Sequence, residues 1–254
     1  LISEMMEERV ISIDVTEDQE DVAKTIRDYD FLAVPVVNSR KELLGIITVD
    51  DIIDVIDDEA ASDYSGLAGV DVEAVAETPL KASIKRLPWL ITLLFLGMST
   101  ATLISHYEVL INEASILAVF ISLITGTAGN AGTQSLAVAV RKLAISDEKD
   151  MSFFKLIINE VLTGLITGCV TGFVIFIVVG FWKDNFILGF VIGIAMLCAI
   201  TVANLAGSFI PILMEKIGFD PAVASGPFIT TLSDLTSVLI YFNIARLFMG
   251  FFIG

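Results

Sequence analysis

The sequence predicts an α-helical, polytopic membrane protein with five transmembrane helices, preceded by a small soluble α/β module. Hydrophobic residues make up 55% of the 254 residues, and the mean hydropathy is +0.82, which is too apolar for a soluble domain of this length. Charge is also unevenly distributed: residues 1–80 hold 21 Asp and Glu against 5 Lys and Arg, whereas the remainder holds 10 of each. The excess acid therefore belongs to the soluble module.

This acidic surface disfavours nucleic acid and favours cations as partners. The two cysteines, Cys169 and Cys198, both lie inside apolar runs, so neither a disulfide framework nor a thiolate metal site is expected. The chain begins at Leu1, in what already reads as folded sequence, and we therefore expect upstream residues to be absent.

The N-terminal module reads as βαββα. A short strand at 10–15 is followed by a polar-faced helix capped by Thr16 and covering 16–30. Two apolar strands, 32–37 and 43–48, flank a turn at 38–41, and a helix follows at 50–56. A module this small would leave an apolar face uncovered unless a second copy packed against it.

A dense run of carboxylates follows the last strand of this module. Seven lie within fourteen residues: Asp50, Asp51, Asp54, Asp57, Asp58, Glu59 and Asp63. Like charges at this density repel one another and are stabilised by cations. The alternative to a cation-binding cluster is an acidic helix end that is simply solvated. A connector, Val70 to Arg86, then ends in basic residues and is expected to lie as a helix against the membrane surface.

Five apolar segments follow, and each is long enough to cross a bilayer. They cover 88–107, 114–140, 153–182, 186–213 and 222–253. Basic residues gather between the second and third segments, at Arg141, Lys142, Lys149 and Lys155. By the positive-inside rule the N-terminal module is cytoplasmic and the C-terminus lies outside the cell membrane.

The last segment carries one carboxylate, Asp234, near its middle. An ionised group is costly there and is expected to face water or a partner rather than lipid. Residues at helical spacing from it are polar or small, which predicts the wall of a pore: Gly226, Pro227, Thr230, Thr231, Ser237 and Tyr241. The alternative is a buried Asp234 that accepts hydrogen bonds from the neighbouring hydroxyls.

Other polar groups lie within the predicted spans. Residues 126–135 include nothing larger than Gln, so this helix either approaches another backbone closely or unwinds locally. Gly164, Gly168 and Gly172 read as a packing seam. Asn204 lies at about the depth of Asp234, and Glu160 lies nearer the cytoplasmic surface. Oxygen ligands without a His or Cys cluster favour a hard cation, and Mg²⁺ suits a dimer that presents two Asp234 carboxylates.

Two resemblances sharpen this interpretation. Residues 1–57, with VPVV, the Gly45–Thr48 run and Asp51, resemble a CBS domain, a module that usually works in pairs and often binds adenosine ligands. The resemblance implies Thr48 and Asp51 as ribose ligands for ATP, although the same pattern also serves a structural turn between strand and helix.

The whole chain resembles the MgtE magnesium transporters and channels. The matching motifs are GNAGTQS at 129–135, NLAGSFIPIL at 204–213 and GFDPAVASGPFITTLSDLTSVLIYF at 218–242. The resemblance implies a homodimer in the lipid bilayer, with a pore between subunits that is lined by the second and fifth helices and closed by cytosolic Mg²⁺. It implies a CBS module at 1–60, an acidic linker and plug helix at 61–87, and a five-helix pore domain at 88–254. Gly226 departs from relatives that have Asn there, and the N domain and first CBS module are absent from these residues.

The motifs and the resemblance together give the expected sites. Pore ligands for Mg²⁺ are Asp234, Asn130, Asn204, Thr230 and Gly129, and the inner mouth has Glu160 and Asp220. Regulatory Mg²⁺ ligands are Asp50, Asp54, Asp57, Asp58, Glu59 and Asp63.

Two other functions stay open. An ion-coupled carrier of divalent cations would use the same polar faces. An intramembrane aspartyl hydrolase would need a second carboxylate beside Asp234, for which Glu160 is the candidate.

Overall fold

The computed structural model describes residues 10–70, 78–145, 153–221 and 225–251. The chain divides into two compact units, Leu1–Asp63 and Tyr64–Gly254, which are treated separately below. Helix α2, Val49–Ala68, is continuous through the boundary between them.

The first unit is a three-stranded sheet with a helix packed on it. Strand β1 (Ile13–Asp14) pairs in parallel with β2 (Ala33–Val37), which pairs antiparallel with β3 (Leu43–Thr48). Helix α1 (Gln19–Asp28) closes the crossover between the parallel strands. Its core combines Val22, Ala23 and Ile26 of α1 with residues of β1, β2 and α2, namely Ile13, Val34 and Ile52. The predicted order of elements is confirmed.

Two details of the N-terminal prediction were wrong. Asp18, not Thr16, caps α1, because its carboxylate accepts a hydrogen bond from the Glu20 amide at 2.9 Å. Thr16 instead closes a turn by donating to Asp14 at 2.7 Å. The first strand is also shorter than predicted, since only Ile13–Asp14 pairs with β2.

An apolar face of this unit stays uncovered, as expected. Leu43, Leu44 and Ile46 on β3 are more than half exposed. Ile53 and Ile56 on α2, the helix that follows β3, are also exposed. A three-stranded sheet with one helix buries too little apolar surface to cover both of its faces.

The second unit contains five helices long and apolar enough to cross a membrane within the described residues. They are α3 (Pro79–His106), α5 (Ile121–Ile145), α6 (Phe153–Trp182), α7 (Phe186–Lys216) and α8 (Gly226–Leu247). Short helix α4 (Glu108–Glu113) and the 3-10 turn η2 (Ser115–Phe120) connect α3 to α5, and a 3-10 turn η4 (Met249–Phe251) follows α8. This confirms the predicted fold class.

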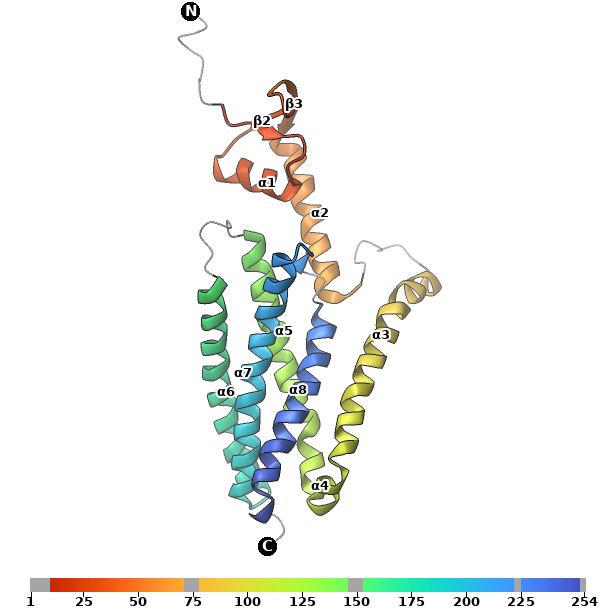
Figure 1. The fold of residues 1–254 in the computed structure, drawn as a ribbon, viewed down its shortest axis with the longest axis vertical. Coiled ribbons are helices and arrows are strands. Elements are labelled where there is room, and N and C mark those ends of the chain that lie inside the picture. Colours follow the sequence, from red (N-terminus) through yellow and green to blue (C-terminus); the bar gives the residue numbers. More distant parts are fainter. Residues whose placement is uncertain (1–9, 71–77, 146–152, 222–224, 252–254) are drawn as a thin grey trace, which may run out of the picture. The chain divides into compact units, whose positions relative to one another are not determined.

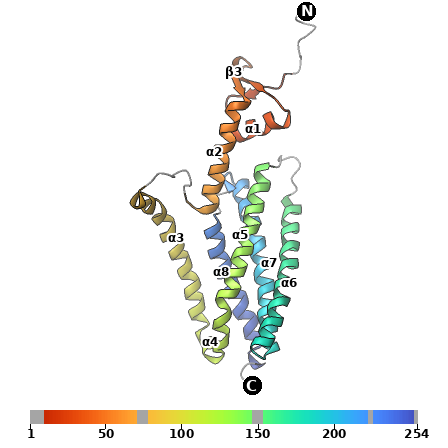
Figure 2. The ribbon, with the colours of Figure 1, turned by 180° about the vertical axis from the view of Figure 1, so that it is seen from behind.

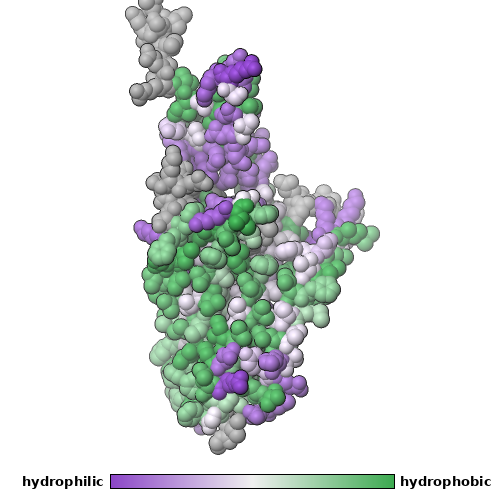
Figure 3. Space-filling model, in the orientation of Figure 1, coloured by the Kyte–Doolittle hydropathy of each residue, from purple (hydrophilic) through white to green (hydrophobic). Residues whose placement is uncertain are grey.

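The helices form a bundle with one outlying member (Figures 1 and 2). Helix α7 packs against α5, α6 and α8, whereas α3 contacts mainly α8 and buries no residue. Outward-facing side chains on α6, including Phe154, Ile166 and Phe173, are mostly exposed and apolar, and the face in Figure 3 is correspondingly hydrophobic over these helices. Such a surface suits hydrocarbon rather than water.

Span boundaries differ from the prediction in two places. Helix α3 begins at Pro79 and continues through Pro88, so the basic end of the connector belongs to the first spanning helix. The last helix ends at Leu247 and not near Ile253. The rest of the connector, residues 71–77, lies outside the described residues, as does Lys149.

Helices α6 and α7 approach almost to backbone contact. A Cβ on Gly172 would lie 2.5 Å from the Gly193 carbonyl oxygen, and a Cβ on Gly193 would lie 2.6 Å from that of Gly172. Gly168 meets Leu197 of α7 in the same way, so the predicted glycine packing seam is confirmed.

Candidate cation site in the membrane

The glycine-rich stretch of α5 is helical throughout and provides close approach rather than unwinding. A Cβ on Gly129 would contact the Thr230 side chain of α8 at 3.4 Å. A Cβ on Gly132 would lie 3.0 Å from the Ser233 hydroxyl and 3.3 Å from the Ala203 carbonyl oxygen. The second and fifth spans therefore meet along small residues at the level of the candidate site.

Asp234 lies one turn after Thr230 on α8 and is half-buried. Among the described residues, no side chain or backbone group donates a hydrogen bond to its carboxylate or forms an ion pair with it. Of the nearby hydroxyls, those of Thr230 and Thr231 both donate to the Pro227 carbonyl, at 2.9 and 2.8 Å, whereas those of Ser233 and Ser237 are buried and form no hydrogen bond with the described residues. The alternative in which neighbouring hydroxyls satisfy a buried Asp234 is not what this arrangement provides.

The polar face of α8 does not stay open along its whole length. Ser237 and Tyr241 are fully buried, and the Tyr241 hydroxyl donates to the Leu117 carbonyl of η2 at 2.9 Å. Pro227, Thr230 and Thr231 are only half-buried. Asp234 thus lies where this face of α8 changes from packed, toward the C-terminus, to partly open, toward the N-terminus.

Asn130 extends the group on the α5 side. It follows Gly129, and its side chain is exposed. The structure therefore brings Gly129 and Thr230 together at a seam between α5 and α8, and Asn130 and Asp234 follow these two residues along their helices, by one residue and by one turn. Carboxylate, amide and hydroxyl oxygens of this kind are ligands that hard cations prefer.

Asn204, the fifth expected pore ligand, lies in a different group. Its side chain is 5% exposed, and in the amide orientation that satisfies both of its polar atoms it donates to the Ala131 carbonyl at 3.0 Å and accepts from the Gly164 amide at 3.3 Å. Asn204 therefore ties α7 to both α5 and α6.

Glu160 belongs to the same group. It is 7% exposed, lies 3.0 Å from the Ser135 hydroxyl and forms an ion pair with Lys142 at 3.6 Å. The Ser135 hydroxyl also lies 2.8 Å from the Asn204 carbonyl oxygen. A buried carboxylate requires such partners. We refer to Ser135, Lys142, Glu160 and Asn204 as the three-helix polar cluster.

Sequence reasoning did not recognise this cluster, although one signal was available. Glu160 precedes Gly164, Gly168 and Gly172 at the same four-residue spacing, so it shares their packing face on α6. The depth of Glu160 in the span predicts the inner mouth, whereas its rotational position predicts the contact between α6 and α7.

The other expected sites lie outside the spans. Asp220 is exposed just before α8, and Asp50, Asp54, Asp57, Asp58 and Glu59 are exposed on α2, with Asp63 half-exposed. Among the residues the structure describes, no three His, Cys, Asp or Glu side chains converge to hold a metal ion. The acidic run alone therefore does not enclose a cation.

Thr48 and Asp51 form a tight turn at the start of α2. The Thr48 hydroxyl and amide both donate to Oδ2 of Asp51, at 2.6 and 3.0 Å, in the pattern of a helix capping box. These hydrogen bonds, that of the hydroxyl first, hold the pKa of Asp51 below its ordinary value of 3.8. The pair has a structural role whether or not a nucleotide binds.

Five helices long and apolar enough to span a membrane, one of them with a carboxylate that has no donor among the described residues, and a small α/β module are typical of a multi-pass membrane transport protein. Comparison with known proteins agrees. Residues 121–244 match the MgtE family, described as a divalent cation transporter, and residues 2–58 match the CBS domain.

Three relatives are each named magnesium transporter MgtE. The chain is 78% identical to that of Enterococcus faecalis over 253 residues, 43% identical to that of Bacillus subtilis over 249 and 34% identical to that of Thermus thermophilus over 253. The matches include 98–100% of this chain but only 55–56% of each relative, so the chain spans a little over half their length.

A crystal structure of the soluble part of a magnesium transporter is 72% identical over 24% of this chain and 23% of that one, with a TM-score of 0.23. The chain belongs to the MgtE family. The resemblance noted from its motifs is confirmed.

Proposed function

We propose that the chain conducts Mg²⁺ across the cytoplasmic membrane, with Asp234 as the ligand that makes a divalent cation stable at mid-membrane. One observation carries the proposal: this half-buried carboxylate has no donor among the described residues, so it is available to a cation. The relatives are named as magnesium transporters, which supports Mg²⁺ as the substrate.

A second copy of the chain would complete the site. Asp234 and the exposed Asn130 follow the two residues of the α5–α8 seam, Thr230 and Gly129, along their helices, and polar side chains of this kind do not suit lipid. A two-fold dimer would pair two such seams and place two Asp234 carboxylates around one axis. Mg²⁺ is usually held through its own waters by one or two carboxylates, so two suffice.

The test replaces Asp234 with Asn, which keeps shape and hydrogen bonding but removes the charge. Mg²⁺ uptake into proteoliposomes should fall at least tenfold, which corresponds to about 1.4 kcal/mol. The control is Asp184→Asn, the same change at an exposed loop residue whose φ of 50° also suits Asn. Unchanged uptake in the Asp234 variant would remove this residue from the transport mechanism.

A channel and an ion-coupled carrier share these polar seams, and the proposal is for a channel. Current recordings in planar bilayers should show unitary Mg²⁺ conductance without a second ion gradient. Uptake that requires a Na⁺ or H⁺ gradient and never shows unitary currents would favour the carrier. Hydrolysis has no support, because Glu160 is paired with Lys142 rather than with Asp234.

We also propose that cytosolic Mg²⁺ closes the pore through α2. This helix contains no Lys or Arg, so its carboxylates at i, i+3 and i, i+4 spacing repel one another by about 0.2–0.5 kcal/mol per pair. The carboxylates of α2 do not enclose a Mg²⁺ ion by themselves. The other ligands of a bound Mg²⁺ would therefore be water molecules and groups from a neighbouring chain or domain. Cation binding would relieve the repulsion and draw these parts together.

The regulatory test removes charge from α2 and measures Mg²⁺ flux while internal Mg²⁺ is titrated. The variant neutralises Asp57, Asp58, Glu59 and Asp63, and inhibition should weaken. The control neutralises four acidic residues near or within α1: Glu17, Glu20, Asp21 and Asp28. The same midpoint and extent of inhibition in both variants would show that the acidic run is only a solvated surface.

The remaining proposals concern orientation and the first unit. Arg141, Lys142 and Lys155, at facing ends of α5 and α6, would place those ends and the N-terminal unit in the cytoplasm. The uncovered apolar face of β3 and α2 would pack against another CBS module. ATP could also bind at Thr48 and Asp51. Because Oδ2 of Asp51 already accepts two hydrogen bonds from Thr48, the nucleotide would have to bind to other atoms of this pair. Calorimetry with ATP tests this proposal.

A further inference from the structure

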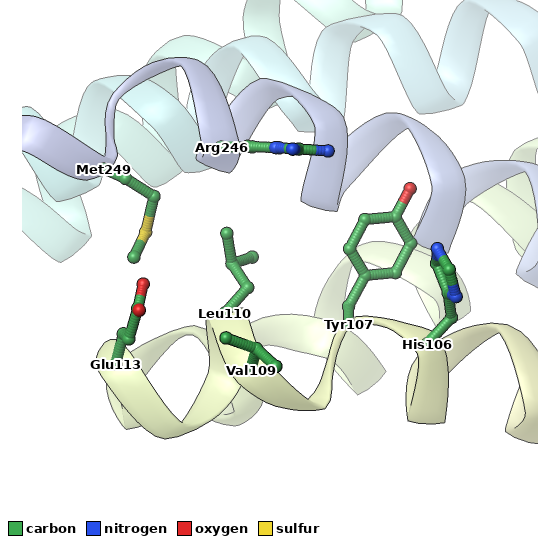
Figure 4. Close-up of a pocket in the computed structure, with 7 residues that line it drawn as sticks. All are labelled: His106, Tyr107, Val109, Leu110, Glu113, Arg246 and Met249. Carbon is green, nitrogen blue, oxygen red and sulfur yellow. The ribbon is translucent and has the colours of Figure 1, made fainter.

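A cavity of about 540 Å³ lies between the α3–α4 corner and the end of α8, away from the cation site. Its lining residues are His106, Tyr107, Val109, Leu110, Glu113, Arg246 and Met249. Figure 4 shows Arg246 and Met249 on the α8 side and the other five on the opposite wall. The volume is within the range of sites for small ligands.

The cavity lies at the ends of two spanning helices. His106 is the last residue of the first spanning helix, and Arg246 is in the final turn of the last one. The cavity therefore opens where two spanning helices end, which is the level of lipid headgroups.

Opposite charges line the cavity without neutralising each other. Among the described residues, Arg246 and Glu113 form no ion pair or hydrogen bond, with each other or with another side chain. The guanidinium is always charged and presents a planar fork of donors that fits two phosphate oxygens. Glu113 offers acceptors to an ammonium group on the same ligand.

The apolar part of the lining continues onto an apolar surface. Leu110 and Met249 contribute apolar lining from the two walls, and Val109, which also lines the cavity, is 71% exposed. Helix α3, which ends at this corner, buries none of its apolar side chains. A ligand held by its headgroup in the cavity could therefore lay a hydrocarbon chain along α3.

We infer that this cavity binds the headgroup of a zwitterionic phospholipid that carries a primary ammonium group, with Arg246 on the phosphate and Glu113 on the ammonium. The shared chemistry is that of phosphoethanolamine. A lipid is the source because the cavity lies at headgroup level beside an uncovered apolar helix. This binding site is separate from the transport path and does not depend on the function proposed above.

The test is native mass spectrometry of the purified protein titrated with phosphatidylethanolamine or phosphatidylcholine of the same acyl chains. Phosphatidylethanolamine should bind at least tenfold more tightly, because a quaternary ammonium has no N–H to donate to Glu113. Equal affinities would overturn the inference, and this comparison needs no variant.

Variants then assign the two contacts. Arg246→Gln should reduce the affinity for phosphatidylethanolamine at least tenfold, and Glu113→Gln should abolish the preference over phosphatidylcholine. The control is Lys183→Gln, which removes a cation at a span end outside the cavity. Loss of binding in the control equal to that in Arg246→Gln would show a general effect of charge and would refute the site.

Soluble glycerophosphoethanolamine distinguishes the source of the ligand. It contains the headgroup without the hydrocarbon chains. If the site binds a lipid, this soluble compound should displace phosphatidylethanolamine only at a far higher concentration than that of the lipid. Competition at equal concentration would overturn the lipid assignment.

Discussion

Lys142→Met tests whether the three-helix polar cluster holds the bundle together. Glu160 is 7% exposed, whereas the Lys142 side chain is 43% exposed, and their charged atoms lie 3.6 Å apart. At an effective dielectric constant of about 20, the attraction is about 4–5 kcal/mol before desolvation is subtracted. Because the Lys142 side chain is partly exposed, water screens this attraction to half or less. The Lys142→Met variant should therefore be destabilised by about 2 kcal/mol, mainly because it leaves the Glu160 charge buried without a partner.

Glu160→Gln should cost less, about 0.5–1 kcal/mol. Glutamine still accepts from the Ser135 hydroxyl, and the lysine left behind has access to water. The double variant should be no less stable than Glu160→Gln alone, because no buried charge remains. The asymmetry between the two single variants is the specific prediction.

Thermal unfolding in detergent, followed by intrinsic fluorescence, measures all three variants. For a unit of this size, 2 kcal/mol corresponds to a fall in Tm of about 4–8 °C. Equal losses in both single variants would refute the reasoning from burial. If Glu160→Gln instead leaves stability unchanged but reduces Mg²⁺ flux, Glu160 serves the inner mouth and not the scaffold.

Two further predictions concern a hydrogen bond and a helix contact. Thr48→Val removes the hydroxyl that donates to Asp51, so the carboxyl pKa should rise toward 3.8 in an NMR titration. Because the folded pKa is depressed, this contribution to stability is complete above pH 3.8 and is lost as the pH falls through the lower folded value; an unshifted midpoint would contradict the assignment. Gly207→Ala places a Cβ against the Gly132 carbonyl and should destabilise by about 1–3 kcal/mol, measured as a lower Tm. Gly126→Ala, with nothing within 4 Å of its Cβ, is the control, and equal Tm values would mean that α5 and α7 separate readily.

The sequence predicted the elements whose pattern is local. The bounds 153–182 for the third span match α6, and the order of strands and helices in the first unit is correct. Long apolar runs between polar loops determine such features, since each helix satisfies its own backbone in the bilayer. The contact between the second and fifth spans at Gly129 and Thr230 agrees with the resemblance.

Features that depend on the rotation of one helix against another were harder to predict. Asn204 lies at about the depth of Asp234 in sequence, yet its amide bonds to α5 and α6. Tyr241 is at helical spacing from Asp234, yet it is buried by η2, a segment more than 100 residues away in sequence. Depth along a span follows from counting residues, but neighbours follow from packing that a single sequence does not display.

The near-contact of Gly172 and Gly193 has a mechanical consequence. Two helices whose backbones touch cannot slide or rotate past each other without one carbonyl colliding with the facing chain. Asn204 links the same pair to α5, so we expect α5, α6 and α7 to move together. Helix α3, which buries nothing, and the partly open N-terminal half of α8 are the parts of the unit left to move. If the chain forms the proposed pore, a change of its width would displace these two segments against α5, α6 and α7.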